Sequence, residues 1–126
     1  SLVDETDVAL VRQSLANLIS NAVKYTQARG HITLRTHVAT DRQAPWPGRW
    51  IAVEVADNGP GIPVQKQGMV FREFARFDPD AAAGSGIGLA ISQRLAVALG
   101  GRITVASTPN VGSAFTLWLP SDPLRR

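Results

Sequence analysis

The sequence predicts an α/β (α+β) two-layer sandwich, with helices packed on one face of a mixed, largely antiparallel sheet. Two segments show helical periodicity, four show the apolar patterns of strands, and their order is helix, two strands, helix, two strands. Hydrophobic residues make up 44% of the 126 residues and charged residues 18%, which favours a folded domain over disorder. We expect one domain covering residues 1–126 with a single core.

The first element is an amphipathic helix over about residues 7–26. Thr6 or Asp7 can cap its N-terminus. Apolar side chains then recur every three or four residues, at Val8, Val11, Leu15, Leu18 and Ala22.

Two strands follow, separated by a loop at 40–49 that is rich in proline and glycine. Residues 31–39 place Ile32, Leu34 and Val38 on one face of a strand. Residues 50–56 are mostly apolar, so we expect this strand in the centre of the sheet.

The second half begins with turn residues at 57–63 and one or two short helical pieces within 64–77. A longer helix is marked by Ile87, Ile91, Leu95 and Ala98, and Gly100-Gly101 is expected to end it. Strands at 102–107 and 113–120 are joined by "TPNVG", which predicts a hairpin.

Composition excludes several function classes. The chain has no cysteine, which excludes disulfides and thiolate chemistry, and its two histidines, His31 and His37, are interpreted as strand surface. The net charge is +3, but the Lys and Arg residues are scattered, so we expect no nucleic-acid partner. No apolar run is long enough to span a bilayer. The start without Met suggests a domain cut out of a longer protein or a processed chain.

Three polar or glycine-rich patterns suggest a ligand site. Asn17, Asn21 and Lys24 form one stripe of the first helix, where amide oxygens can bind Mg²⁺ and the ammonium can meet phosphates. Asp57 follows a strand directly and can accept a hydrogen bond from the amino group of adenine. Residues 84–88, "GSGIG", expose backbone N–H groups at a helix start, which can bind an anion.

Each pattern also has a structural interpretation: asparagines that fix a helix–sheet contact, an Asx-turn after the strand, and a plain glycine-rich loop. The glycines do not match a P-loop, because no Lys follows them, and they do not match the dinucleotide fingerprint, because no strand precedes them.

Together the patterns resemble the GHKL family of ATPases and kinases, which share the Bergerat ATP-binding fold. "LANLISNAVKYT" is similar to the N box of sensor histidine kinases, "VADNGPGIP" to their G1 box and "VFREFARF" to their F box. "GSGIGLAIS" is similar to the G2 box and "VGSAFTLWLP" to the last-strand motif, where Asn110 stands in place of a usual glycine. The motifs cover nearly the whole chain in the family's order.

The resemblance implies ATP and Mg²⁺ as cofactors. By similarity, Asp57 binds the adenine amino group with Ser113 helping through a water, Asn21 is the Mg²⁺ ligand, and Lys24 and Arg76 reach the phosphates. Asn17 lies one turn before Asn21. The remaining implied ATP-binding residues are Tyr25, Gly59, Gly61, Gly84, Gly86, Gly88 and Leu89. An ATP lid is expected at about 71–85.

The hydrolytic relatives carry a glutamate where this chain has Asn17, so we expect slow intrinsic ATP hydrolysis. Neither histidine lies in the helical context of a phosphoacceptor, so the resemblance implies transfer to a histidine on a separate dimerisation and phosphoacceptor domain, and then indirectly to a response regulator. We expect a cytoplasmic, monomeric domain, with any membrane attachment outside this sequence. Two alternatives stay open: a serine kinase of the anti-sigma-factor type, and a non-catalytic nucleotide- or partner-binding module.

Overall fold

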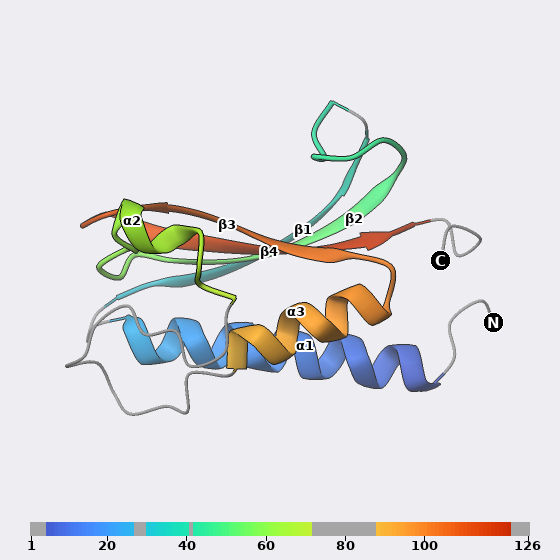
Figure 1. Ribbon diagram of the computed structural model, residues 1–126, viewed down its shortest axis with the longest axis horizontal. Coiled ribbons are helices and arrows are strands. Elements are labelled where there is room, and N and C mark those ends of the chain that lie inside the picture. The colour runs from blue at the N-terminus through green and yellow to red at the C-terminus, as the bar shows by residue number, and fades with distance from the viewer. Residues whose placement is uncertain (1–4, 27–29, 41, 72–87, 122–126) are drawn as a thin grey trace.

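The computed structural model describes residues 5–26, 30–40, 42–71 and 88–121. Its elements are α1 (Glu5–Tyr25), β1 (Ile32–Ala39), β2 (Trp50–Asp57), α2 (Val64–Gln67), α3 (Gly88–Ala98), β3 (Arg102–Thr108) and β4 (Gly112–Pro120). Figure 1 shows α1 and α3 side by side on one face of the sheet. The predicted two-layer α/β fold is therefore confirmed.

The four described strands form one sheet in the order β1-β2-β4-β3. All three of their pairings are antiparallel, and the apolar strand β2 lies inside the sheet, as its composition predicts. The β3–β4 hairpin and the end of β2 lie at one end of the sheet, and the connection between β1 and β2 lies at the other.

The core lies between the sheet and the two long helices. Because side chains alternate along a strand, one side of the sheet carries rows of apolar residues that run across β2, β4 and β3. Val55, Phe115 and Val105 form one such row, and Val53, Leu117 and Ile103 form the next. They pack against α1 and α3, chiefly against the buried Leu18, Ala22 and Ala96.

Strand β1 contributes less to the core than its apolar pattern suggests. Ile32 packs against the core, but Leu34 and Val38, on the same face, are each 52% exposed. The helices contact β2, β3 and β4 but make few contacts with β1, so most of this strand stays uncovered.

The buried face of α3 differs from the stripe that marks it in the sequence. Ile91 and Ala98 are exposed, whereas the buried residues are Leu89, Ala90, Ser92, Ala96 and, just after the helix, Leu99. The end of the helix is as predicted: Gly100 has φ 83°, its N–H bonds to Val97 O, and the Gly101 N–H bonds to Ala96 O. These are the two bonds of a Schellman motif.

A side-chain amide also joins α3 to the outer strand of the sheet. Gln93 Nε2 donates to Ile103 O at 2.9 Å, and Ile103 N donates to Gln93 Oε1 at 2.8 Å. Both backbone groups of Ile103 are therefore used by one side chain, and this fixes the rotation of α3 against β3.

Three tryptophans form a second, smaller cluster on the other side of the sheet. Trp118 is buried with Ala39, Ala44 and Ala52, and Trp46 and Trp50 pack against them. The Trp46 and Trp118 rings meet edge to face at 6.1 Å, and Trp118 Nε1 donates to Thr104 Oγ1 at 2.8 Å. The loop between β1 and β2 thus folds back over this end of the sheet.

Candidate functional site

A cavity of about 730 Å³ lies at the end of the sheet opposite the tryptophan cluster. It is enclosed by α1, the segment that follows β2, and the β3–β4 hairpin. Its lining residues are Asn21, Asp57, Pro60, Gly61, Ile62, Pro63, Val64, Gln65, Pro109, Asn110, Ser113 and Phe115. The size is that of a pocket for a small organic ligand.

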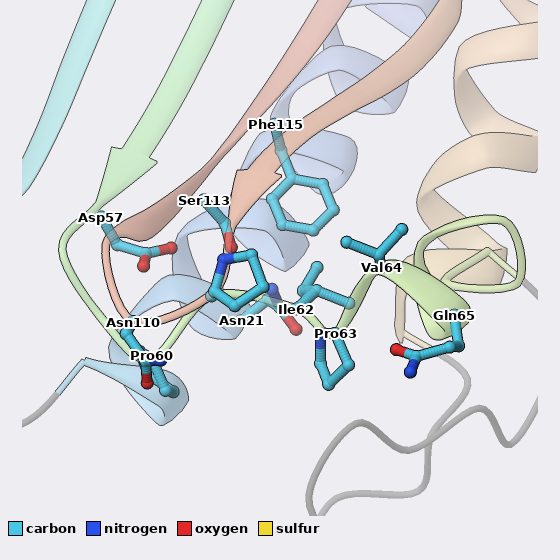
Figure 2. Close-up of a pocket in the computed structure, with 12 residues that line it drawn as sticks. Asn21, Asp57, Pro60, Ile62, Pro63, Val64, Gln65, Asn110, Ser113 and Phe115 are labelled. Carbon is cyan, nitrogen blue, oxygen red and sulfur yellow. The ribbon is translucent and has the colours of Figure 1, made fainter.

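The sheet supplies a polar row next to an apolar one. Asp57, Ser113 and Ser107 are cross-strand partners on β2, β4 and β3, one row beyond Val55, Phe115 and Val105. The Ser107 and Ser113 hydroxyl oxygens lie 2.8 Å apart. Figure 2 shows the Asp57 carboxylate and Ser113 at the strand ends, with Phe115 and Ile62 beside them. This arrangement fits a flat apolar ring system that carries a hydrogen-bonding group on one edge.

Asp57 is held by the turn that it begins. Gly59 N donates to Asp57 Oδ1 at 2.9 Å, which is the Asx-turn that the sequence allows. Within the described part of the chain, Oδ2 has no such donor, so the turn leaves the second carboxylate oxygen for a ligand. The structural and the ligand-binding interpretations of Asp57 are therefore compatible.

The segment after Asp57 forms one wall of the cavity and is tied to the hairpin by hydrogen bonds. Asn110 N donates to Pro60 O at 2.6 Å, and Ile62 N donates to Ser107 Oγ at 2.8 Å. Gln67 Nε2 adds bonds to Ile62 O at 2.9 Å and to Ser107 O at 3.1 Å. We call this segment, residues 60–67, the wall segment.

Backbone conformation permits the close approach of wall and hairpin. Gly61 has φ 73°, and a Cβ there would collide with the carbonyl oxygen of Thr108. A Cβ on Gly112 would collide with the carbonyl oxygen of Asp57. Asn110 has φ 65°, so it adopts the left-handed conformation that glycine or asparagine tolerates. The departure from glycine at this position is therefore structurally mild.

The helix α1 contributes the opposite side of the cavity. Asn21 is half-buried and lines it (Figure 2). Asn17 is half-buried one turn earlier, where its Oδ1 accepts a hydrogen bond from Gln13 Nε2 at 3.1 Å. Lys24 is exposed in the last turn, where it complements the helix dipole.

The structure brings together four of the predicted site residues as cavity lining: Asn21, Asp57, Gly61 and Ser113. Gly59 supports Asp57, whereas Asn17, Lys24 and Leu89 lie outside the lining, Leu89 being buried in the core. Gly88 is the first residue of α3, and Tyr25 is the last of α1. Arg76, Gly84 and Gly86, and nearly all of the predicted lid, lie outside the described residues.

Several lining residues are not marked individually by the sequence patterns. Pro60, Ile62 and Pro63 lie within the "VADNGPGIP" motif, and Phe115 is two residues after Ser113, on the same face of β4. The alternation along β4 could have identified Phe115. Ser107 is not itself part of this lining but contacts two lining residues, Ser113 across the hairpin and Ile62, which is 45 residues away in the sequence.

The donor set at the cavity fits a metal that arrives with a ligand better than a resident one. The described residues hold no cluster of three His, Cys, Asp or Glu side chains that could bind a metal ion. Asn21 offers one amide oxygen, and Mg²⁺ typically takes few protein ligands and completes its shell with waters and phosphates.

Among the residues that the structure describes, no helix is long and apolar enough to cross a membrane.

Comparisons with known proteins agree with this geometry. Residues 6–123 match the sequence profile of the histidine kinase-, DNA gyrase B- and HSP90-like ATPases. The circadian input-output histidine kinase CikA of Synechococcus elongatus is 37% identical over 125 residues, which are 97% of this chain and 16% of CikA. This chain therefore spans a small part of that relative.

Solved structures give the same result. The mycobacterial sensor histidine kinase MprB superposes with a TM-score of 0.74 at 29% identity, over 89% of this chain and 72% of that one. Full-length ShkA in complex with AMPPNP superposes with a TM-score of 0.71 at 34% identity, over 92% of this chain and 23% of that one. One of these two structural relatives is thus a sensor histidine kinase, and the other was solved with an ATP analogue.

Proposed function

The chain belongs to the family of histidine kinase-, DNA gyrase B- and HSP90-like ATPases, and from this membership we propose that it binds Mg-ATP in the cavity at Asp57. We further propose that it donates the γ-phosphoryl group to a histidine on a separate dimerisation and phosphoacceptor domain. The product would serve two-component signal transduction, with a response regulator as the indirect partner.

The position of Asp57 carries this proposal. Its carboxylate lies at the end of β2 beside an apolar surface that includes Phe115 and Ile62, and one of its oxygens is held by Gly59 N–H. A purine ring can lie on the apolar surface while its exocyclic amino group donates to the free oxygen. ShkA, solved with AMPPNP, supports a nucleotide rather than another flat ligand.

The phosphates are assigned to the α1 side of the cavity. Asn21 supplies the amide oxygen for Mg²⁺, which when bound neutralises phosphate charge. The exposed Lys24, one turn later, has the reach and charge to meet phosphate oxygens. By resemblance Arg76 acts there too, Tyr25 lines the pocket, and the backbone at Gly84, Gly86, Gly88 and Leu89 faces the phosphates at the end of a lid at about 71–85.

Slow hydrolysis is part of the same proposal. Asn17 carries an amide, which cannot take a proton from water at neutral pH, and its Oδ1 already accepts a hydrogen bond from Gln13. A site that holds Mg-ATP without a base for water suits transfer to another nucleophile. The exposed His31 and His37 lie before and on the strand β1, so the acceptor histidine is assigned to another domain.

Calorimetric titration with ADP and with the ATP analogue AMPPNP, each with and without Mg²⁺, tests the binding step. Replacement of Asp57 by Asn is expected to lower affinity about 10- to 100-fold, because a hydrogen bond to a charged group contributes about 1.5–3 kcal/mol. Glu54→Gln is the matched control, since Glu54 lies on the same strand with its side chain on the other side of the sheet. Equal affinities in the wild type and Asp57→Asn would refute the assignment.

The transfer step needs the longer protein that contains this domain. After incubation with Mg²⁺ and γ-labelled ATP, label that is lost in acid and kept in alkali indicates phosphohistidine. Label that survives acid would favour the serine-kinase alternative. Nucleotide binding with no label in any form would favour the non-catalytic module.

A further inference from the structure

We propose that Ser107 is a positioning residue that fixes the Ser113 hydroxyl as a hydrogen-bond acceptor, so that the base end of the cavity selects a 6-amino purine over a 6-oxo purine. The inference rests on the proposed nucleotide-binding function and adds the origin of its base selectivity. It follows from the hydrogen bonds that meet at the Ser107 hydroxyl.

The Ser107 hydroxyl has three partners, which use all of its bonding capacity. A hydroxyl carries one hydrogen and two lone pairs. Its hydrogen goes to Gly112 O, at 3.0 Å, because a carbonyl can only accept. The Ile62 N–H, at 2.8 Å, can only donate and occupies one lone pair. Ser113 Oγ lies 2.8 Å away, a distance at which either hydroxyl could donate. All three contacts are satisfied together only if Ser113 donates to the remaining lone pair of Ser107.

This arrangement decides what Ser113 offers to the cavity. Its only hydrogen points along the row to β3, which leaves lone pairs for a ligand. Its cross-strand neighbour Asp57 also offers only acceptor oxygens, one of which is already bonded to Gly59 N–H. A water that bridges Asp57 and Ser113 would donate one hydrogen to each of them. It would then present only its lone pairs to the ligand and would also act as an acceptor. In either case the Asp57 and Ser113 side chains, among the residues that the structure describes, accept hydrogen bonds from a ligand and do not donate to it.

An acceptor-only surface discriminates at position 6 of a purine. The amino group of adenine brings two hydrogens, whereas the carbonyl of hypoxanthine or guanine would face acceptors with no hydrogen between them. A buried polar group left unpaired is costly, which makes such a mismatch selective. Loss of the Ser107 hydroxyl would free the Ser113 hydrogen to turn toward the cavity and donate to a 6-carbonyl.

The test compares the affinities of ADP and inosine diphosphate, which differ at the 6-position and the adjacent ring nitrogen, by calorimetry with Mg²⁺ present. In Ser107→Ala the ratio of ADP affinity to inosine diphosphate affinity is expected to fall about ten-fold, the effect of one hydrogen bond exchanged for a mismatch. Ser107→Thr keeps the hydroxyl and should keep the ratio.

Two further variants separate the effect of hydrogen-bond direction at Ser113 from the effect of a looser wall segment. Gln67→Ala loosens the same wall segment without touching either hydroxyl, so both affinities should fall together and the ratio should stay. The double variant Ser107→Ala/Ser113→Ala removes the freed donor and should recover most of the ratio. Ser107→Cys, close in volume, replaces Ser107→Ala if that protein does not fold, with a smaller shift expected in the same direction.

An unchanged ratio in Ser107→Ala that still binds ADP would overturn the inference and leave the proposed function intact. An equal change of the affinity ratio in Gln67→Ala would overturn the inference as well, because a looser wall segment would then explain the change in both variants. Failure of the wild type to bind ADP at all would instead refute the proposed function.

Discussion

The two ends of the sheet are closed in different ways. At the β1–β2 connection, ring contacts join Trp46 to Trp50 and to Trp118, and the three side chains pack in one apolar cluster. At the β3–β4 hairpin, hydrogen bonds hold the wall segment in place, at Pro60, Ile62 and Gln67, and a cavity of about 730 Å³ remains. Aromatic packing at the first end stabilises the fold, whereas hydrogen bonds at the second end hold the wall segment and the β3–β4 hairpin around a cavity for a ligand.

The largest effect is expected from breaking the aromatic end. Trp118→Ala removes a ring that is 8% exposed together with its bond to Thr104, so the free energy of unfolding should fall by about 3–5 kcal/mol. Chemical denaturation measures this loss. If the two ends are independent, ADP affinity of the folded variant stays within about twofold of the wild type. A parallel loss of affinity would show that the ends are coupled.

Gly61→Ala should damage the cavity end next most strongly. The left-handed conformation at φ 73° costs an alanine about 1–2 kcal/mol, and its Cβ would push the wall segment off Thr108. We expect ADP affinity to fall by more than about ten-fold in calorimetry. The matched control is Gly68→Ala, because Gly68 has φ −72° and a Cβ added there would meet no atom within 4 Å. Equal behaviour of the two variants would contradict the account of Gly61.

Gln67→Ala sharpens the comparison by removing two hydrogen bonds of a half-buried side chain that is not part of the apolar core. Stability should fall by about 1–2 kcal/mol, the sum of two modest bonds, as measured by denaturation. Faster amide exchange is expected at Ile62, whose N–H lies beside the lost bonds. Unchanged exchange there would mean that the remaining ties alone hold the wall segment.

The smallest effect is expected at the hairpin turn. Asn110→Gly should change stability by no more than about 0.5 kcal/mol, because both residues tolerate the left-handed conformation at φ 65°. Asn110→Ala at the same site should lose about 1 kcal/mol, which thermal denaturation can resolve from the glycine variant. Equal stability of the alanine and glycine variants would argue against strain at this turn.

Local patterns in the sequence predict most of the fold. The central place of β2, the stop at Gly100-Gly101 and the hairpin with a left-handed Asn110 all follow from residues close together in the chain. The buried stripe of α3 does not, since Ile91 is as apolar as the residues that are buried. Tertiary contacts, among them the bond pair between Gln93 and Ile103, determine which side faces the sheet.

The residues of the site likewise divide into those that local patterns predict and those that only tertiary contacts reveal. Asn21, Asp57, Gly61 and Ser113 stand in motifs with recognisable spacing, and the structure lines one cavity with them. Ser107 and Ile62 are 45 residues apart, so no local pattern indicates their bond. The exposure of Leu34 and Val38 is equally hidden in the sequence, because it depends on how far the helices extend over β1.

The contact between Gln93 and Ile103 also bears on the association of this domain with other copies through the edge of the sheet. β3 is an outermost strand of the described sheet, and such a strand offers unpaired N–H and C=O groups on which a foreign strand can template. At Ile103 both groups are already taken by an amide of the same chain. At this point of the edge, an intruding strand would therefore first have to displace the Gln93 side chain.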